Sequence, residues 1–139
     1  MEPVIKTNEE WKKVLSPMEY LVLREKATEA PFSGEYDHEF NEGTYVCAAC
    51  GLEIFNSEYK FDSRCGWPAF DRANEGSVKL VEDTSYGMHR IEALCTQCDG
   101  HLGHVFPDGP GTLKPGVTGT GDRYCINSVS LKFIPKKTA

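Results

Sequence analysis

The sequence predicts a mainly β protein with a helical segment at its N-terminus. Apolar residues recur at helical spacing in the first thirty positions, whereas after Gly34 the chain consists of short β-type runs broken by Gly, Pro, Asn and Asp. A length of 139 residues suits one compact domain. We therefore expect a single domain over 1–139, in which a helical arm, 1–31, precedes a β core, 34–134.

Two short helices are expected in the arm. Asn8 is a suitable N-cap for the first. Residues 16–19 read Ser-Pro-Met-Glu, a capping box with proline in the first turn, which predicts the start of the second. Ala30 and Pro31 should end it. The side chains expected to face inward are Trp11, Val14, Leu15, Met18, Leu21 and Val22.

Five strands are expected after the arm. They are 44–46, 53–55, 78–81, 89–94 and 123–134. In the last of them, alternation places Cys125, Asn127, Val129, Leu131 and Phe133 on one face. Residues 107–121 are rich in Gly and Pro, which predicts a loop.

Charge and hydropathy argue against several classes of protein. The net charge is −6, whereas proteins that bind nucleic acid generally gain affinity from an excess of Lys and Arg. No apolar run approaches the roughly 20 residues of a membrane-spanning helix. Residues 1–6 lack the basic and then apolar layout of a secretory signal. We expect a cytoplasmic protein with neither a nucleic-acid nor a membrane partner.

Four of the six cysteines form two close pairs. Cys47 and Cys50 make one Cys-x-x-Cys motif, and Cys95 and Cys98 make another. Zinc prefers four tetrahedral ligands, and such a motif lets two thiolates from one tight turn share the ion. With four sulfur ligands the ion would have no position left for substrate, so we expect one structural Zn²⁺ per chain.

Other interpretations of the two pairs are weaker. Gly51 and Gly100 follow the pairs and suit the backbone turns that a zinc site requires. Two disulfides would be unusual in a reducing compartment. A thioredoxin-type redox motif would need a βαβ pattern, which surrounds neither pair.

The remaining cysteines, Cys65 and Cys125, are single. Arg123, Cys125 and Asn127 alternate along the expected last strand, so a cation, a thiol and an amide should share one face. A nearby positive charge favours the thiolate, the form in which cysteine is a nucleophile. The ordinary alternative is that Cys125 is a small buried apolar residue.

The other candidate residues each have a plain structural interpretation. His101 and His104 could complete a metal shell or make surface hydrogen bonds. Trp67 could belong to the core, and Asp108 could be a turn residue before Gly109. The polar stretch 35–39, with Asp37 and His38, is expected to be a solvated loop, and His89 is expected to be structural.

Four ordered segments resemble the methionine-R-sulfoxide reductase B family: 43–51, 65–70, 98–106 and 123–128. The resemblance extends from about Trp11 to Phe133. It implies a fold of two small antiparallel sheets with an N-terminal helical segment and a zinc site of four cysteines. It also implies an oxidoreductase that returns the R epimer of methionine sulfoxide in proteins to methionine, with thioredoxin as the reductant.

The same resemblance implies roles for individual residues. Cys125 would be the catalytic cysteine and Cys65 the resolving cysteine, while Trp67 would pack on the methyl group of the substrate. The surrounding polar site would consist of His101, His104, Asp108, Arg123 and Asn127. The zinc ligands would be Cys47, Cys50, Cys95 and Cys98.

These roles give a mechanistic hypothesis. The Cys125 thiolate attacks the sulfoxide sulfur while His104 or His101 protonates the oxygen, and Cys125 becomes a sulfenic acid. Cys65 then forms a disulfide with Cys125, which a dithiol donor reduces. One alternative is a zinc-ribbon binding module without catalysis, although the acidic balance does not favour it. Another is a Cys–His hydrolase, for which the sequence identifies no oxyanion hole.

Overall fold

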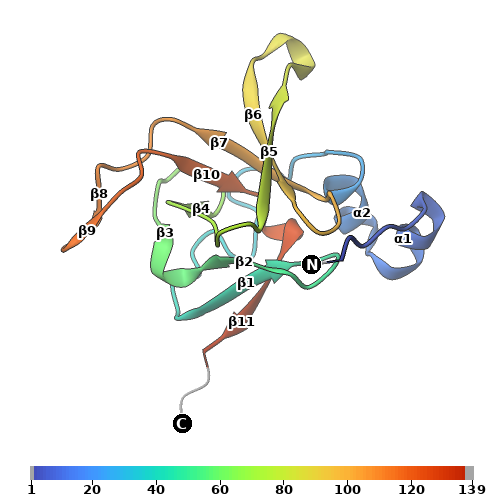
Figure 1. Ribbon diagram of the computed structural model, residues 1–139, viewed down its shortest axis with the longest axis horizontal. Helices are drawn as coiled ribbons and strands as arrows, with labels where there is room; N and C mark the ends of the chain where they lie inside the picture. The colour runs from blue at the N-terminus through green and yellow to red at the C-terminus, as the bar shows by residue number, and fades with distance from the viewer. Residues whose placement is uncertain (1, 137–139) are drawn as a thin grey trace.

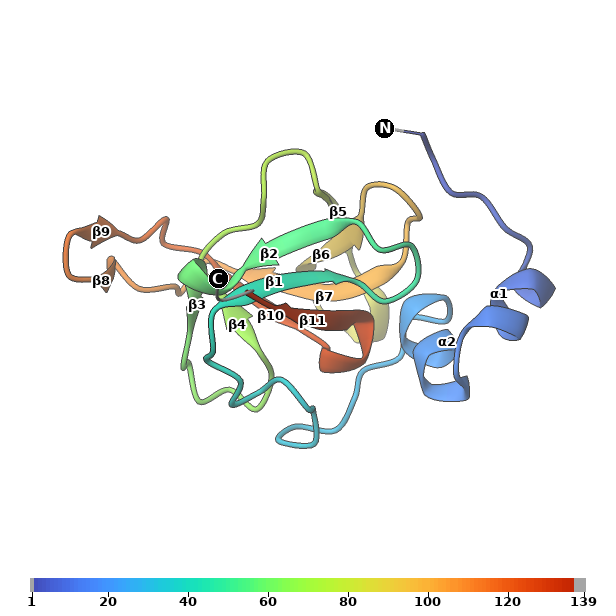
Figure 2. The same ribbon diagram turned by 90° about the horizontal axis from the view of Figure 1, so that it is seen from below.

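The computed structural model describes residues 2–136, and within them the chain forms two α-helices and eleven β-strands (Figure 1). Helices α1 (Asn8–Val14) and α2 (Pro17–Leu23) lie together at one end of the molecule, beside the sheets (Figure 2). No helix in the described part of the chain has the length and apolar character needed to cross a bilayer.

Both helices begin at capping boxes. At α2 the predicted cap is confirmed: the Ser16 hydroxyl accepts from the Glu19 N–H, and the Glu19 carboxylate accepts from the Ser16 N–H. At α1 the predicted cap was wrong by one residue. Thr7 rather than Asn8 is the N-cap, because Thr7 is the residue that stands three positions before a glutamate, Glu10.

The second helix ends earlier than predicted. It stops at Leu23 rather than near Ala30, because Lys26 adopts a left-handed backbone (φ 64°) and the Ala27 N–H bonds to the Leu21 carbonyl at 2.9 Å. Residues 24–34 therefore form an irregular segment instead of a helical turn.

The predicted inner faces of the helices were partly wrong. Trp11, Leu15 and Val22 are buried as expected. Each helix has only two turns. Helix α2 packs against β7 (His101–Phe106) and the 3₁₀ turn Ser128–Ser130, whereas α1 packs against α2, so three of the predicted side chains point outward. These exposed side chains are Val14, Met18 and Leu21.

The strands form three antiparallel sheets. The first has the order β11–β1–β2, with β1 Gly43–Cys47, β2 Glu53–Asn56 and β11 Leu131–Pro135. The second has the order β3–β4–β10–β7–β6–β5. Its strands are Lys60–Phe61, Ala69–Phe70, Arg123–Ile126, His101–Phe106, Arg90–Cys95 and Val78–Asp83. The prediction of a mainly β fold with antiparallel sheets is confirmed, although a third, two-stranded sheet accompanies the two that were predicted.

Several strands differ from the sequence prediction. The predicted loop 107–121 contains a two-stranded hairpin, β8 (Thr112–Lys114) and β9 (Val117–Thr118), which projects from the body in Figure 1. The predicted strand 123–134 is two strands, β10 and β11, that belong to different sheets. Strands β3, β4 and β7 were not predicted.

Asn127 is the reason for the break between β10 and β11. Its side chain accepts from the Glu29 N–H at 3.0 Å and donates to the Leu102 carbonyl at 3.1 Å, which holds the chain at the point where it leaves β10. A 3₁₀ turn, Ser128–Ser130, follows. The single alternating face predicted from Cys125 to Phe133 therefore ends at Asn127.

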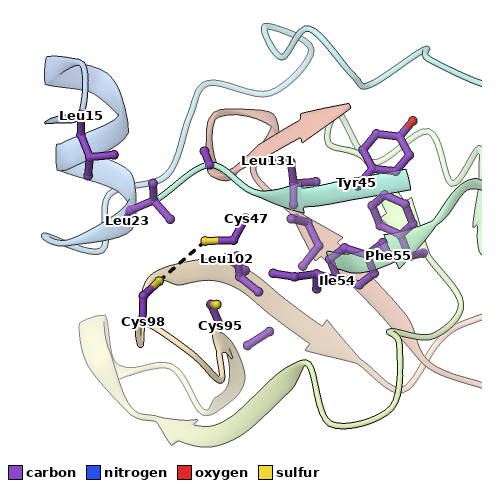
Figure 3. Close-up of a cluster of buried hydrophobic side chains, with 14 of the residues drawn as sticks. Leu15, Leu23, Tyr45, Cys47, Ile54, Phe55, Cys95, Cys98, Leu102 and Leu131 are labelled. Atoms are coloured by element: carbon purple, nitrogen blue, oxygen red, sulfur yellow. Dashed lines mark hydrogen bonds between the residues drawn. The ribbon is translucent and has the colours of Figure 1, made fainter. Parts of the chain in front are cut away.

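The core lies between the helices and the two larger sheets (Figure 3). Leu15 and Leu23 reach it from the helices, and aromatic side chains fill its centre. Phe55 and Phe70 stack with ring centroids 4.2 Å apart, and Tyr45 meets Phe70 edge-on at 5.1 Å. Three of the paired cysteines, Cys47, Cys95 and Cys98, lie at the border of the same core, so their site is built into it.

Candidate active site and metal centre

The two Cys-x-x-Cys pairs converge on one cluster. Cys47 is the last residue of β1 and Cys95 the last residue of β6, so each pair follows a strand of a different sheet. The sulfurs of Cys47 and Cys98 are 3.6 Å apart, those of Cys50 and Cys95 are 3.5 Å apart, and all four lie within 4.8 Å of one another. Figure 3 shows three of these side chains directed toward one point.

This cluster fits a tetrahedral metal ion. Zn–S bonds of about 2.3 Å place tetrahedral sulfurs about 3.8 Å apart, close to the observed separations. Four thiolates so close together would repel one another without a cation between them. Three of the four cysteines are buried, and no acidic side chain or histidine joins the group among the described residues. The four cysteines could therefore hold a metal ion in a closed site.

The two cysteine turns have the same backbone design. The N–H groups of Gly51 and Asp99 bond to the carbonyls of Cys47 and Cys95, both at 2.8 Å. Gly51 and Asp99 are both left-handed, with φ of 82° and 60°. The prediction that Gly100 supplies the turn was therefore wrong. Gly100 instead allows close packing, because a Cβ there would stand 2.9 Å from Leu23 Cδ2 and 3.2 Å from the Cys98 sulfur.

The two single cysteines meet at a different place. Cys125 lies on β10, and Cys65 lies in the loop between β3 and β4, yet their sulfurs are 3.6 Å apart. Left-handed residues, Arg64 and Gly66, stand on both sides of Cys65 and turn its side chain toward Cys125. The loop is held from outside, because the Phe32 N–H donates to the Gly66 carbonyl at 2.7 Å.

The thiol pair shares a proton unequally. The pKa of Cys65 is lowered to about 5, chiefly by the hydrogen bond from Cys125; burial opposes this, and Ser63 and the charge of Arg123 assist it. The pKa of Cys125 is raised, because this thiol keeps the shared proton and is buried, although Arg123 acts in the opposite direction. Within the pair, Cys65 therefore loses its proton more readily than Cys125.

A pocket of about 220 Å³ opens at this pair. It is lined by Thr28, Cys65, Trp67, Arg90, Gly103, His104, Phe106, Arg123, Cys125 and Asn127. Arg123, Cys125 and Asn127 thus share one surface. Trp67 and Phe106 supply apolar walls, while His104, directly opposite Cys125 in the β7–β10 register, supplies a polar group.

The residues predicted for the polar site fall into two groups. His104, Arg123 and Asn127 line the pocket, whereas His101 and Asp108 do not. Asp108 binds Arg123 from outside through two contacts of 2.9 and 3.3 Å. His101 is buried against Glu92, 2.7 Å from its Nδ1, and burial lowers the pKa of this histidine.

Several residues of the site were missed by the sequence analysis. Glu29 joins two pocket residues through its backbone, accepting from the Trp67 indole at 3.0 Å and donating to Asn127. Asp83 and Glu92 stand behind the histidines, and Arg90 lines the pocket. A signal existed for Asp83 and Glu92, because acidic residues are depleted in strands and these two flank or occupy predicted strands. No comparable signal marked Glu29.

One polar segment was predicted wrongly. His38 is exposed as expected, but Asp37 is buried, and its backbone carbonyl accepts a hydrogen bond from the buried Lys60 at 3.3 Å. Burial lowers the pKa of Lys60 to about 8. His89, which was expected to lie in a strand, stands just before β6, where it is exposed and pairs with Glu82 across the β5–β6 hairpin.

Comparison with known proteins adds a consistent result. A family model described as a SelR domain matches residues 15–135. A peptide methionine sulfoxide reductase MsrB of Bradyrhizobium diazoefficiens is 58% identical over 136 residues, which cover 97% of this chain and 93% of the relative. The protein with the same description from Methanosarcina barkeri is 56% identical over 131 residues, 94% of this chain and 87% of the relative. The one from Pseudomonas putida is 52% identical over 140 residues, with full coverage of both chains. The similarity extends over the segments that carry both cysteine pairs and the pocket.

Proposed function

The chain belongs to the MsrB family of peptide methionine sulfoxide reductases, and we propose that it reduces the R epimer of methionine sulfoxide in proteins to methionine. The observation that carries the proposal is the pair of thiols, 3.6 Å apart, in a pocket with apolar and proton-donating walls. The choice of the R epimer comes from the family resemblance.

In the bound substrate, the sulfoxide would lie between an apolar wall and a polar wall of the pocket. The methyl group packs against Trp67, whose ring is fixed by its indole hydrogen bond to Glu29. The sulfoxide oxygen faces His104, the histidine that lines the pocket, so we assign the proton donor to His104 rather than to His101. His101 lies behind His104, where it contacts the His104 ring and Glu92.

In the first chemical step, Cys125 reacts as a thiolate. The shared proton moves from Cys125 to Cys65, and Arg123 stabilises the charge that this leaves on Cys125. The Cys125 sulfur attacks the sulfoxide sulfur while protonated His104 gives its proton to the oxygen. Methionine leaves, and Cys125 is oxidised to a sulfenic acid.

The second step uses the neighbouring thiol. The Cys65 sulfur attacks the sulfenic sulfur of Cys125, and the Cys65 proton and the hydroxyl group leave together as water. The product is a Cys65–Cys125 disulfide. A dithiol protein then reduces it by thiol–disulfide exchange, and we propose thioredoxin for this role on the family resemblance.

The paired cysteines have a separate, structural task. Cys47, Cys50, Cys95 and Cys98 would hold one zinc ion, which when bound cross-links the two larger sheets. Such a thiolate site and a recyclable dithiol both need reduced cysteines, so we place the protein in the cytoplasm. We treat 1–139 as one catalytic domain, because Glu29 of the arm holds both Trp67 and Asn127.

The test is thiol-dependent reduction of a peptide that carries methionine-R-sulfoxide, with the S epimer as substrate control. We expect turnover of the R epimer only, and its loss, by at least about 1,000-fold, in Cys125→Ser. The Cys125→Ser protein should keep its zinc content and thermal stability. If reduced, zinc-loaded protein turned over neither epimer, the proposal would be wrong, and the zinc-ribbon binding module would become the better interpretation.

A further inference from the structure

Two buried carboxylates stand behind the histidines of β7. Asp83, the last residue of β5, and Glu92, on β6, have side chains only 1% and 8% exposed. Lys26, from the irregular segment after α2, bridges them: its ammonium is 3.0 Å from Asp83 and 3.1 Å from Glu92. Neither carboxylate has a role in the mechanism described above.

Asp83 uses both of its oxygens as acceptors. Oδ1 accepts from the N–H and the hydroxyl of Ser85, at 3.0 and 2.7 Å, and pairs with Lys26. Oδ2 lies 2.7 Å from Nε2 of His104. The hydrogen bond from His104, followed by those from Ser85, lowers the pKa of Asp83. An ionised carboxylate can only accept, so the His104 nitrogen that faces it must carry a hydrogen.

We infer that Asp83 is a positioning residue, which holds His104 with its hydrogen on Nε2 and so presents Nδ1 to the thiol pocket. Nδ1 makes none of the hydrogen bonds found among the described residues, and His104 lines the pocket opposite Cys125. The inference rests on the proposed function for the role of His104 as proton donor. The inference goes further by naming the donating atom, Nδ1 of His104, and the residue that determines it, Asp83.

Asp83 also stabilises the charged form of the donor. When Nδ1 takes a proton, the imidazolium is formed 2.7 Å from a buried anion. The charged or titratable groups that face His104 come from several elements. They are Glu25 and Lys26 before the β core, Asp83 on β5, Arg90 and Glu92 on β6, His101 on β7, and Arg123 and Cys125 on β10, with Cys65 across the pocket.

Glu92 offers a matched control. It is also buried and bound to Lys26, but its histidine partner is His101, through Nδ1 at 2.7 Å, and His101 does not line the pocket. Loss of charge at Glu92 should therefore disturb the same cluster without changing the proton-donating atom of His104.

The first experiment needs no variant and no turnover. Nitrogen-15 NMR of the histidine side chains in reduced, zinc-loaded protein reports which ring nitrogen of His104 carries hydrogen when the ring is neutral. We expect hydrogen on Nε2. Hydrogen on Nδ1 would overturn the inference, whatever the protein reduces. Conversely, protein with the expected tautomer but no turnover of either sulfoxide epimer would refute the proposed function and leave the tautomer assignment standing.

The second experiment compares Asp83→Asn with Glu92→Gln in single-turnover reduction of the R-sulfoxide peptide and in the nitrogen-15 spectrum of His104. Asp83→Asn should slow reduction by about 100-fold at neutral pH, within the range of general acid catalysis. It should also change the His104 signals, because the carboxylate that holds hydrogen on Nε2 is lost. Glu92→Gln should leave the His104 signals unchanged, because the histidine partner of Glu92 is His101. Equal rates and equal His104 signals in the two variants would overturn the inference, and if Asp83→Asn did not fold, the NMR result on the wild-type protein would decide.

Discussion

The chain contains two clusters of cysteine sulfurs that have similar S–S distances but different surroundings. In the four-cysteine cluster each sulfur has a neighbour at 3.5 or 3.6 Å, and in the Cys65–Cys125 pair the separation is also 3.6 Å. The first cluster is built from two repeated backbone turns within the core. The second joins a strand to an irregular loop and opens into a pocket beside Arg123.

The difference shows that sulfur proximity alone does not determine the chemistry. Four thiolates in a closed, repeated frame satisfy a tetrahedral cation and leave no position for a substrate. Two thiols in an open, asymmetric frame share one proton, and the one next to Arg123 can become a nucleophile. We therefore propose that the number of sulfurs and their access to solvent distinguish the structural metal site from the redox site.

The largest expected effect is a loss of thermal stability when the four-cysteine cluster loses a ligand or its metal. Structural zinc contributes about 10–16 kcal/mol in small domains, comparable to or above the roughly 5–15 kcal/mol net stability of a folded protein. We expect Cys47→Ser, or prolonged chelation of wild-type protein, to abolish cooperative thermal unfolding. Circular dichroism and zinc analysis would measure this, with Cys125→Ser as the matched single-sulfur control. A metal-free protein with an unchanged Tm would show that a metal in this cluster does not stabilise the fold.

A smaller effect, on thiol pKa values rather than on folding, is expected at the Cys65–Cys125 pair. In wild type, Cys65 titrates near pH 5 because Cys125 donates a hydrogen bond to it, and the pKa of Cys125 is raised for the same reason. Cys65→Ser removes the largest cause of the raised pKa and leaves Arg123 in place. We therefore expect one thiolate transition in the variant, above pH 5 and below the second transition of wild type.

Thiolate absorbance as a function of pH would follow this change. Single-turnover reduction should continue in Cys65→Ser, while recycling through the disulfide should be lost. A transition that stayed near pH 5 in Cys65→Ser would mean that Cys125, and not Cys65, carries the low-pKa thiolate. Unchanged recycling would contradict the resolving role of Cys65.

The same contrast explains what could be predicted from the sequence. Each Cys-x-x-Cys turn is local, so spacing alone indicated a metal site. Cys65 and Cys125 are 60 positions apart, and only the family resemblance paired them before the structure was known. The carboxylates behind the histidines depend on the register of the β5–β6 hairpin, in which Asp83 faces Arg90. The break at Asn127 depends on a side-chain bond to Leu102, which hydrophobic alternation does not reveal.

The smallest expected effect concerns a single hydroxyl at the open pair. The Ser63 hydroxyl donates to the Cys65 sulfur at 2.8 Å, and this contributes to the lowered pKa of Cys65. Ser63→Ala should raise that pKa above about 5, because the thiolate loses one donor while the Cys125 hydrogen bond is retained. Alkylation of Cys65 should slow near pH 5 and change little at pH 8, where the thiolate still predominates. Ser33→Ala, which removes a hydroxyl that binds the Ala30 carbonyl, should leave the alkylation profile unchanged. Equal alkylation profiles for wild type and Ser63→Ala would show that the Ser63 hydroxyl does not lower the pKa of Cys65. The low pKa would then be due to Cys125 and Arg123.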